Sequence, residues 1–224
     1  MMGTIQAQAA PGERMVYRAA RAYTDRATKA AYIAEKYAAI LGGSVLDVGC
    51  DEGRLRRLVP RPDLYVGVDV NPSADLVVNL DERNLPLDDR SFDCVLCTDV
   101  LEHLERCHAV FDEICRVSRS RVVVSLPNPM RALVMALFER GARHLGKYGL
   151  PVDPPGDRHR WFFGHDDAKR FVTERGRRQG FEVEQLDVEG SGCYYWLDRT
   201  GVDVLSGEDL HAGTMWCVLR RADG

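Results

Sequence analysis

The sequence lacks a long apolar run. No stretch approaches the roughly 18 residues that a membrane-spanning helix needs, and the first residues lack the apolar centre of a secretion signal. An excess of basic residues is also missing, because the formal net charge of the 224 residues is −4. We therefore expect a cytoplasmic protein without a membrane span, and not one whose main task is to bind nucleic acid phosphates.

The cysteines do not form the patterns of a disulfide framework or a metal site. They number seven, an odd count, and are scattered. Cys94 and Cys97 have the spacing of a metal pair, but they lie in an apolar run that predicts a buried strand. Side chains three apart on a strand point to opposite faces, so these two thiols cannot share one metal. No other set of His, Cys, Asp and Glu has convincing ligand spacing, and we predict no metal site.

What the sequence does contain is a regular alternation of short apolar runs and helical stretches. The runs predict strands at residues 45–48, 65–68, 76–78, 92–97, 121–126, 181–188 and 214–219. Helices are predicted within 17–41, around 54–59 and 109–118, from Met130, and over 166–178, with His165 or Asp166 near the last cap. This alternation is typical of a doubly wound α/β fold with a mostly parallel, seven-stranded sheet.

The most specific local signal follows the first predicted strand. Val45–Val48 run into a glycine-bearing loop that ends at Gly53, and a helical pattern follows. A strand, a tight loop and a helix start bring backbone amides close to a nucleotide-like ligand. Asp69 ends the second strand 20 residues after Gly49, about where this fold places the acid that holds ribose hydroxyls. These features predict an adenosine-binding half-domain.

Four segments occur in order along this half of the chain. They are Asp47-Val48-Gly49-Cys50-Asp51-Glu52-Gly53, Val68-Asp69, Asn84-Leu85-Pro86-Leu87 with Ser91-Phe92-Asp93, and Val100-Leu101-Glu102-His103-Leu104. With them the chain resembles the class I S-adenosylmethionine-dependent methyltransferases, in the small-molecule, type 11 group. A weaker similarity, over Val123-Val124-Ser125-Leu126-Pro127-Asn128, is to methyltransferase-like proteins associated with methionine biosynthesis. The resemblance implies S-adenosylmethionine as the cofactor.

The resemblance assigns the first loop to the cofactor's amino-acid end. Asp47 would organise the loop, and Gly49, Cys50 and Gly53 belong to it. The loop departs from the family at Asp51, where a glycine is usual. Aspartate adds a side chain and a negative charge beside the cofactor, which is tolerated if the side chain turns outward and weakens the site if it does not.

The resemblance also assigns the other contacts of the cofactor. Asp69 would accept both ribose hydroxyls, and Val70 would pack against the adenine. Leu80 would line the base, Asp81 would accept from the adenine amino group, and Thr98 would meet the methionine moiety.

Two histidines are the candidates for catalysis. His103 lies just beyond the fourth strand's carboxyl end, where ligands bind in open α/β sheets. A neutral imidazole there could take a proton from a hydroxyl or amine acceptor. His159 is a rival, as is His165. The alternative for His103 is a structural role, in which Glu102 and His103 start the next helix and His103 caps or packs.

We expect one domain in four parts: a helical cover (1–41), a cofactor-binding half (42–126), a substrate lid inserted after the fifth strand (127–165) and a final helix with the last strands (166–224). The lid combines a proline break, an apolar helix and a Gly/Pro-rich loop. Basic residues outnumber acidic ones between 139 and 178, which suits an anionic substrate, although solvated helix faces explain the charge equally well.

Together these patterns predict an enzyme that transfers a methyl group from S-adenosylmethionine to a small-molecule acceptor, with oxygen favoured over nitrogen as the acceptor atom. The alternative is an accessory or regulatory subunit that binds the cofactor and catalyses nothing. A nicotinamide-dependent oxidoreductase is disfavoured, because the first loop lacks the usual glycine spacing.

Overall fold

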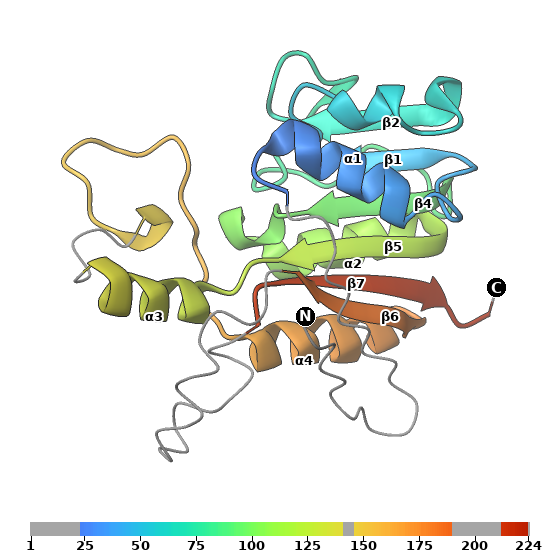
Figure 1. Ribbon diagram of the computed structural model, residues 1–224. Coiled ribbons are helices and arrows are strands. Elements are labelled where there is room, and N and C mark those ends of the chain that lie inside the picture. Colours follow the sequence, from blue (N-terminus) through green and yellow to red (C-terminus); the bar gives the residue numbers. More distant parts are fainter. Residues whose placement is uncertain (1–22, 141–145, 190–211, 224) are drawn as a thin grey trace, which may run out of the picture.

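A computed structural model describes residues 23–140, 146–189 and 212–223, and they form one seven-stranded sheet with helices on both faces (Figure 1). The strand order is β3-β2-β1-β4-β5-β7-β6. The strands are β1 Val45–Val48, β2 Tyr65–Asp69, β3 Leu76–Val77, β4 Phe92–Thr98, β5 Ser118–Leu126, β6 Phe181–Glu189 and β7 Thr214–Arg221. Strands β1 to β5 pair in parallel, and β7 is antiparallel to both β5 and β6. The predicted doubly wound, mostly parallel sheet is confirmed.

Four α-helices flank the sheet: α1 Arg26–Lys36, α2 Cys107–Val117, α3 Pro129–Arg140 and α4 His165–Arg178. Helix α4 begins at His165 with Gly164 as its N-cap residue, so His165 and Asp166 lie next to the cap as predicted, and Gly164 makes no side-chain capping bond. Part of the helical stretch predicted within 17–41 lies outside the described residues. No described helix is both long enough and apolar enough to cross a membrane.

Short 3₁₀ turns complete the fold: η1 Arg54–Arg57, η2 Pro62–Leu64, η3 Leu101–His103 and η4 Gly146–Tyr148. The helix predicted around 54–59 is therefore only the single turn η1. Pro60 explains the early end, because proline disfavours helical geometry in the residue before it and has no amide hydrogen to continue a helix. The first loop is therefore followed by one short 3₁₀ turn and not by a helix of several turns.

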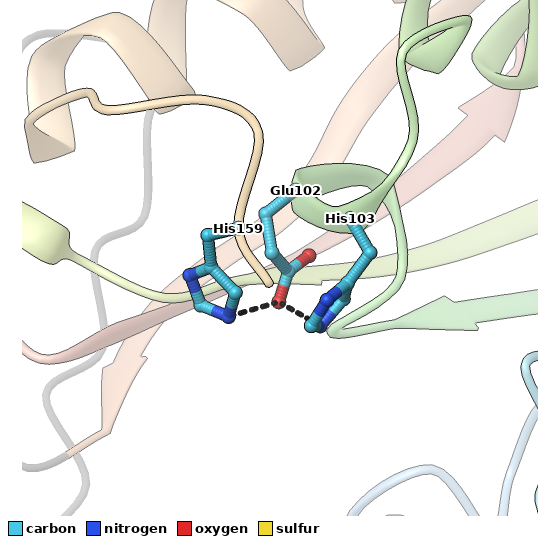
Figure 2. Close-up of side chains that lie close together, drawn as sticks. All are labelled: Glu102, His103 and His159. Atoms are coloured by element: carbon cyan, nitrogen blue, oxygen red, sulfur yellow. Dashed lines mark ion pairs between the residues drawn. The ribbon is translucent and has the colours of Figure 1, made fainter. Parts of the chain in front are cut away.

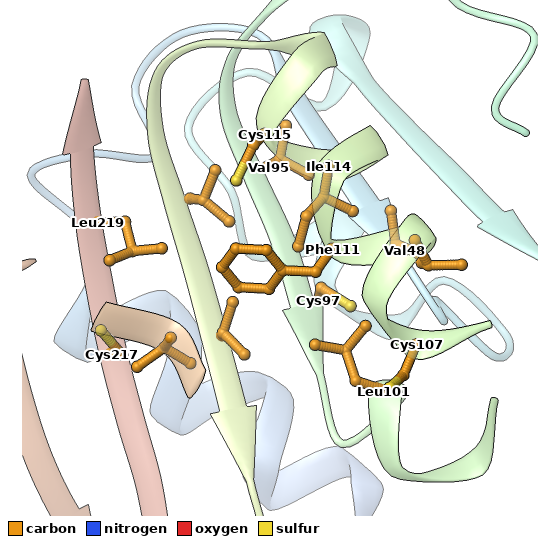
Figure 3. Close-up of a cluster of buried hydrophobic side chains, with 14 of the residues drawn as sticks. Val48, Val95, Cys97, Leu101, Cys107, Phe111, Ile114, Cys115, Cys217 and Leu219 are labelled. Atoms are coloured by element: carbon orange, nitrogen blue, oxygen red, sulfur yellow. The ribbon is translucent and has the colours of Figure 1, made fainter. Parts of the chain in front are cut away.

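The hydrophobic core lies in two layers, one on each face of the sheet. One cluster joins the sheet to α2 and α4, and Phe111 of α2 is fully buried within it (Figure 3). The other cluster joins the opposite face to α1. Cys97 belongs to the first cluster and Cys94 to the second. The two thiols therefore point to opposite faces, as the strand periodicity predicts.

Candidate active site

A cavity of about 740 Å³ opens at the carboxyl ends of β1, β2 and β4. Helix α1 forms a further part of its wall, and residues 155–158 with Arg160 close the side opposite the strands. Its volume is typical of a small-molecule site. In Figure 1 residues 146–164 are seen beyond the carboxyl ends of β4 and β5.

The first loop requires glycine at one position above all. Gly49 has φ +80°, and a Cβ added to it would overlap Val100 Cγ2, so any other residue here would strain the backbone and displace the Val100 side chain. Its amide donates to the carbonyl of Val68 over 2.8 Å, which ties the loop to the end of β2. Cys50 also lines the cavity. Gly53 adopts φ +66° before η1 and is not part of the cavity wall.

Asp47 lies at the floor of the cavity, on β1. The residue is buried, and the hydroxyl of Tyr65 donates to its carboxylate. Burial raises the pKa of Asp47 to about 6, because a charged carboxylate is poorly solvated there. A cationic group placed above this floor would therefore meet a carboxylate that water does not screen.

Asp69 fixes two loops with one carboxylate. Its Oδ2 accepts the amide of Asp51 over 2.8 Å, and its Oδ1 accepts the amide of Asn71 over 2.9 Å. A carboxylate has about four lone-pair sites, so about two remain for a ligand in the cavity that Asp69 lines. Val70, next in the chain, lines the same cavity and is 65% exposed, which leaves an apolar surface open to a ligand.

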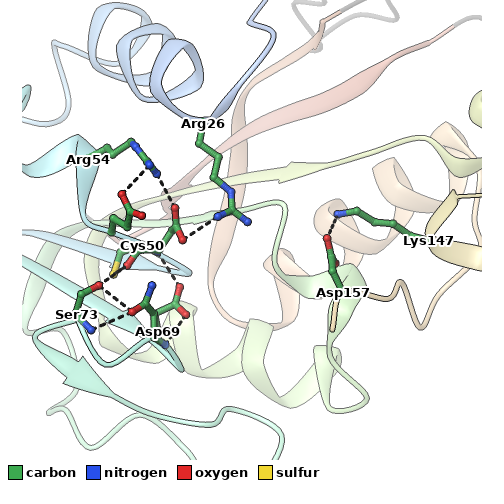
Figure 4. A network of polar contacts seen from close by, with 10 residues as sticks. Arg26, Cys50, Arg54, Asp69, Ser73, Lys147 and Asp157 are labelled. Carbon is green, nitrogen blue, oxygen red and sulfur yellow. Dashed lines mark hydrogen bonds and ion pairs between the residues drawn. The ribbon is translucent and has the colours of Figure 1, made fainter. Parts of the chain in front are cut away.

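Asp51, the departure from the family pattern, also adopts a left-handed conformation, with φ +52°. Its Oδ1 pairs with Arg26 of α1 over 2.9 Å and its Oδ2 with Arg54 over 2.7 Å (Figure 4). Two guanidinium groups thus compensate the negative charge that Asp51 adds to the loop. Arg26 and Arg54 line the cavity with it.

Of the remaining residues predicted to bind the cofactor, two line the cavity and one does not. Leu80 and Thr98 line the cavity. Asp81 does not, and its Oδ1 accepts the amide of Arg106 over 3.1 Å. Sequence reasoning missed Lys29 of α1, which lines the cavity, pairs with Asp99 over 2.7 Å and donates to the Thr98 carbonyl over 3.2 Å.

The two histidine candidates meet around one carboxylate (Figure 2). Glu102 Oε1 lies 3.7 Å from Nε2 of His103 and 4.0 Å from Nε2 of His159. The imidazole rings are nearly perpendicular, with centroids 4.6 Å apart. His103 lines the cavity, whereas His159 does not. The third candidate, His165, is buried in the first turn of α4 and is also absent from the wall.

Burial shifts the proton affinities in this cluster. It raises the pKa of Glu102 to about 8, helped by the negative charge of Asp99. It lowers the pKa of His159 to about 4, helped by the nearby His103. The pKa of His103 is lowered too, first by burial and then by Lys147. Both imidazoles are therefore neutral at pH 7.

The loop that carries His159 is joined to η3 by backbone and side-chain contacts. The amide of Arg160 donates to the Glu102 carbonyl over 2.7 Å, and Trp161 Nε1 donates to the Leu104 carbonyl over 2.7 Å. Within the loop, Lys147 pairs with Asp157 over 2.8 Å (Figure 4). These contacts hold the loop against the strand-end cavity.

Comparisons with known proteins agree with this geometry. Residues 46–125 match the model of a methyltransferase domain. No curated protein matches the sequence. A SAM-dependent methyltransferase from Archaeoglobus fulgidus is 18% identical, with a TM-score of 0.56 over 88% of this chain and 95% of that one.

Two further solved structures share the fold at low identity. Magnesium protoporphyrin IX methyltransferase from Synechocystis PCC 6803, with bound SAH, is 15% identical, with a TM-score of 0.54 over 87% of this chain and 82% of that one. The small RNA methyltransferase HEN1 is 16% identical, with a TM-score of 0.59 over 93% of this chain but 27% of that one. Residues 46–125 therefore match a methyltransferase domain, and the chain shares the fold of solved S-adenosylmethionine-dependent methyltransferases.

Proposed function

We propose that the protein transfers the methyl group of S-adenosylmethionine to a small-molecule acceptor, at oxygen rather than nitrogen. The observation that carries this proposal is the continuity of one cavity. It runs from the loops after β1 and β2 to His103 and the residues 155–158 opposite. The cofactor would occupy the strand side and the acceptor the loop side, which brings the two reactants together in one cavity.

The residues present fit the cofactor. Asp69 has lone pairs left for a ribose diol after holding two loop amides. Val70 and Leu80 offer apolar surface to the adenine, and Asp47 with Thr98 would face the amino-acid end. The Asp81 carboxylate, off the wall and bonded to the Arg106 amide, would reach an adenine amino group only after a local change.

The loop side suits an anionic acceptor. Lys147, Arg158 and Arg160 line it. Lys147 pairs with Asp157 and Arg160 pairs with Glu105, so among the described residues Arg158 is the cation left to meet an anionic group. The cofactor supplies an electrophilic methyl group. Transfer would join the acceptor oxygen to the methyl carbon as the carbon–sulfur bond breaks and its electron pair stays on sulfur. The acceptor proton would pass to a neutral His103.

We also propose that residues 127–165 act as a lid over the acceptor, with residues 42–126 as the cofactor-binding half. Support comes from the exposed tip, where Leu150 and Val152 are fully exposed, and from the lining by residues 155–158. A segment with an exposed tip and an anchored base can open without disturbing the core.

Methyl-labelled S-adenosylmethionine tests the function. The protein is incubated with a cell extract and labelled cofactor, and the label is followed in the small-molecule, RNA and protein fractions, with Asp69→Ala as the inactive control. Label in the small-molecule fraction supports the proposal. Label in RNA would refute the acceptor class, an arm that the likeness to HEN1 makes necessary. Cofactor binding without any transfer would favour an accessory subunit instead.

A further inference from the structure

Three potential metal ligands face one another beside the cavity. Glu102, His103 and His159 each offer one ligand atom, and these atoms all lie within 4.8 Å of one another. Glu102 and His103 belong to η3, and His159 comes from a loop 56 residues after His103 in the chain. In Figure 2 one oxygen of Glu102 lies between the two rings. The Nε2–Oε1 separations of 3.7 and 4.0 Å are too long for hydrogen bonds.

The surroundings of both rings assign the same tautomer. His103 Nδ1 faces the Arg158 carbonyl at 3.1 Å and the Asp157 carboxylate at 3.0 Å. Both partners only accept, so Nδ1 carries the hydrogen and Nε2 has the lone pair.

The ring of His159 follows the same logic through a hydroxyl. Tyr148 donates its one hydroxyl hydrogen to the Trp161 carbonyl over 2.9 Å. Its oxygen must then accept from His159 Nδ1, 2.8 Å away. The Nε2 lone pair of His159 is therefore also directed at Glu102. Donation of the outer ring nitrogen to an oxygen is the usual support of a metal-binding histidine.

Two buried polar atoms of the cluster have no hydrogen-bond partner among the described residues. Glu102 is 1% exposed. Among the described residues, neither its Oε2 nor Nε2 of His159 has a hydrogen-bond partner, and both atoms are buried. Two nitrogen lone pairs and the carboxyl group of Glu102 converge on one point, and as a carboxylate Glu102 would leave only acceptors there. Such a set is unfavourable by itself, because buried polar atoms without hydrogen-bond partners destabilise the folded state, and a bound cation would give all three ligand atoms a partner.

We propose that Glu102, His103 and His159 bind a divalent first-row transition cation, with its open coordination positions turned to the cavity. Two imidazoles and one carboxylate suit zinc, manganese, iron or cobalt rather than magnesium, which prefers oxygen alone. Ligand bonds of about 2.1 Å place ligand atoms about 3.4 Å apart, so the cluster needs to contract by less than about 1.5 Å. His159, on a surface loop, can supply that movement.

The site goes beyond the proposed methyl transfer, because cation binding needs neither cofactor nor acceptor. It also changes the role of His103. With Nε2 on the cation, His103 is a ligand and not a base. An acceptor hydroxyl that meets an open coordination position would have its pKa lowered and lose its proton to water.

The test is metal titration of the full chain after dialysis against a chelator. Zn²⁺, Mn²⁺ and Co²⁺ are added separately, with calorimetry for stoichiometry and the visible spectrum of Co²⁺ for ligand geometry. We expect one equivalent to bind. Glu102→Gln and His159→Gln should each lower affinity more than about 100-fold, and Tyr148→Phe by about 10- to 100-fold. His108→Asn, in an exposed histidine outside the cluster, is the matched control and should leave affinity unchanged.

Binding of S-adenosylhomocysteine by the same variants, measured by calorimetry, shows that they fold. Because Tyr148→Phe removes only a hydroxyl, it keeps the test decisive if a ligand variant does not fold. The proposal is overturned if none of the three cations binds stoichiometrically. It is equally overturned if cations bind the Tyr148→Phe and Glu102→Gln variants as tightly as the wild type, because the ligands then lie elsewhere.

Discussion

Replacement of Asp69 by alanine should weaken cofactor binding strongly. The Asp69 carboxylate has about four lone-pair sites. Two of them accept hydrogen bonds from the backbone amides of Asp51 and Asn71, at 2.8 and 2.9 Å. The other two would accept the ribose hydroxyls. A hydrogen bond to a charged group contributes about 1.5–3 kcal/mol. Loss of this partner should therefore raise the dissociation constant about 10- to 150-fold, and release of the two loops adds to the effect.

Calorimetry with S-adenosylhomocysteine measures this change without turnover. Asp81→Ala is the matched control, because it removes a nearby carboxylate that is off the cavity wall and bonded to the Arg106 amide. We expect it to cost less than about tenfold in affinity, and circular dichroism of both variants checks that the fold is retained. Equal affinity of wild type and Asp69→Ala would remove Asp69 from the site. A larger loss in Asp81→Ala would show that the adenine amino group does reach Asp81.

Three further changes test other parts of the site. Asp51→Gly should leave the fold intact and cofactor affinity equal or tighter by calorimetry, because glycine suits φ +52° and exposed ion pairs add little; a large loss would mean that Asp51 contacts the cofactor directly. Burial raises the pKa of Asp47 from 3.8 to about 6 in the folded protein. The folded state therefore holds the Asp47 proton more tightly than the unfolded state does. The resulting stability is fully present below pH 3.8 and is lost as the pH rises through about 6. Denaturant titrations should show the unfolding free energy of wild type falling, relative to Asp47→Asn, by up to about 3 kcal/mol between about pH 4 and 7, whereas parallel pH profiles would contradict the burial argument. Replacing residues 149–154 by a short linker should abolish turnover and spare cofactor binding. Hydrogen exchange of the backbone amides measures the opening of the lid directly. Uniformly slow exchange through 146–160 in the ligand-free protein would show that this segment is a permanent wall of the cavity and not a lid.

The sheet was predictable because its strands are buried on both faces. Runs such as Val122-Val123-Val124 leave no polar face, so strand positions follow from hydrophobicity alone. The helix predicted at 54–59 was wrong because its apolar spacing ignored Pro60. The local pattern located His165 near the start of α4, but it did not indicate that the His165 side chain would be buried.

The site was predictable only where its residues are close in sequence. The first loop and Asp69 follow strand ends, so a local pattern locates them. Lys29 reaches Asp99 from 70 residues away, and His159 reaches Glu102 only because the loop folds back on η3. No spacing rule detects such a pairing. The prediction of no metal site rested on sequence spacing, which does not detect three potential ligands that meet only in the folded chain.

The position of β7 has a consequence for how the chain assembles during synthesis. Strand β7 lies between β5 and β6, although it follows β6 in the sequence. In the described sheet β6 therefore has no neighbour until residues 214–221 have left the ribosome. Until then β6 has no paired strand, and the apolar side chains of Phe181 and Leu186 lack the β7 neighbours that help to bury them. Non-local pairing of this kind slows folding and prolongs exposure to proteases and chaperones. Nascent chains arrested before Thr214 should thus be cleaved within 181–189 while residues 45–126 already resist digestion.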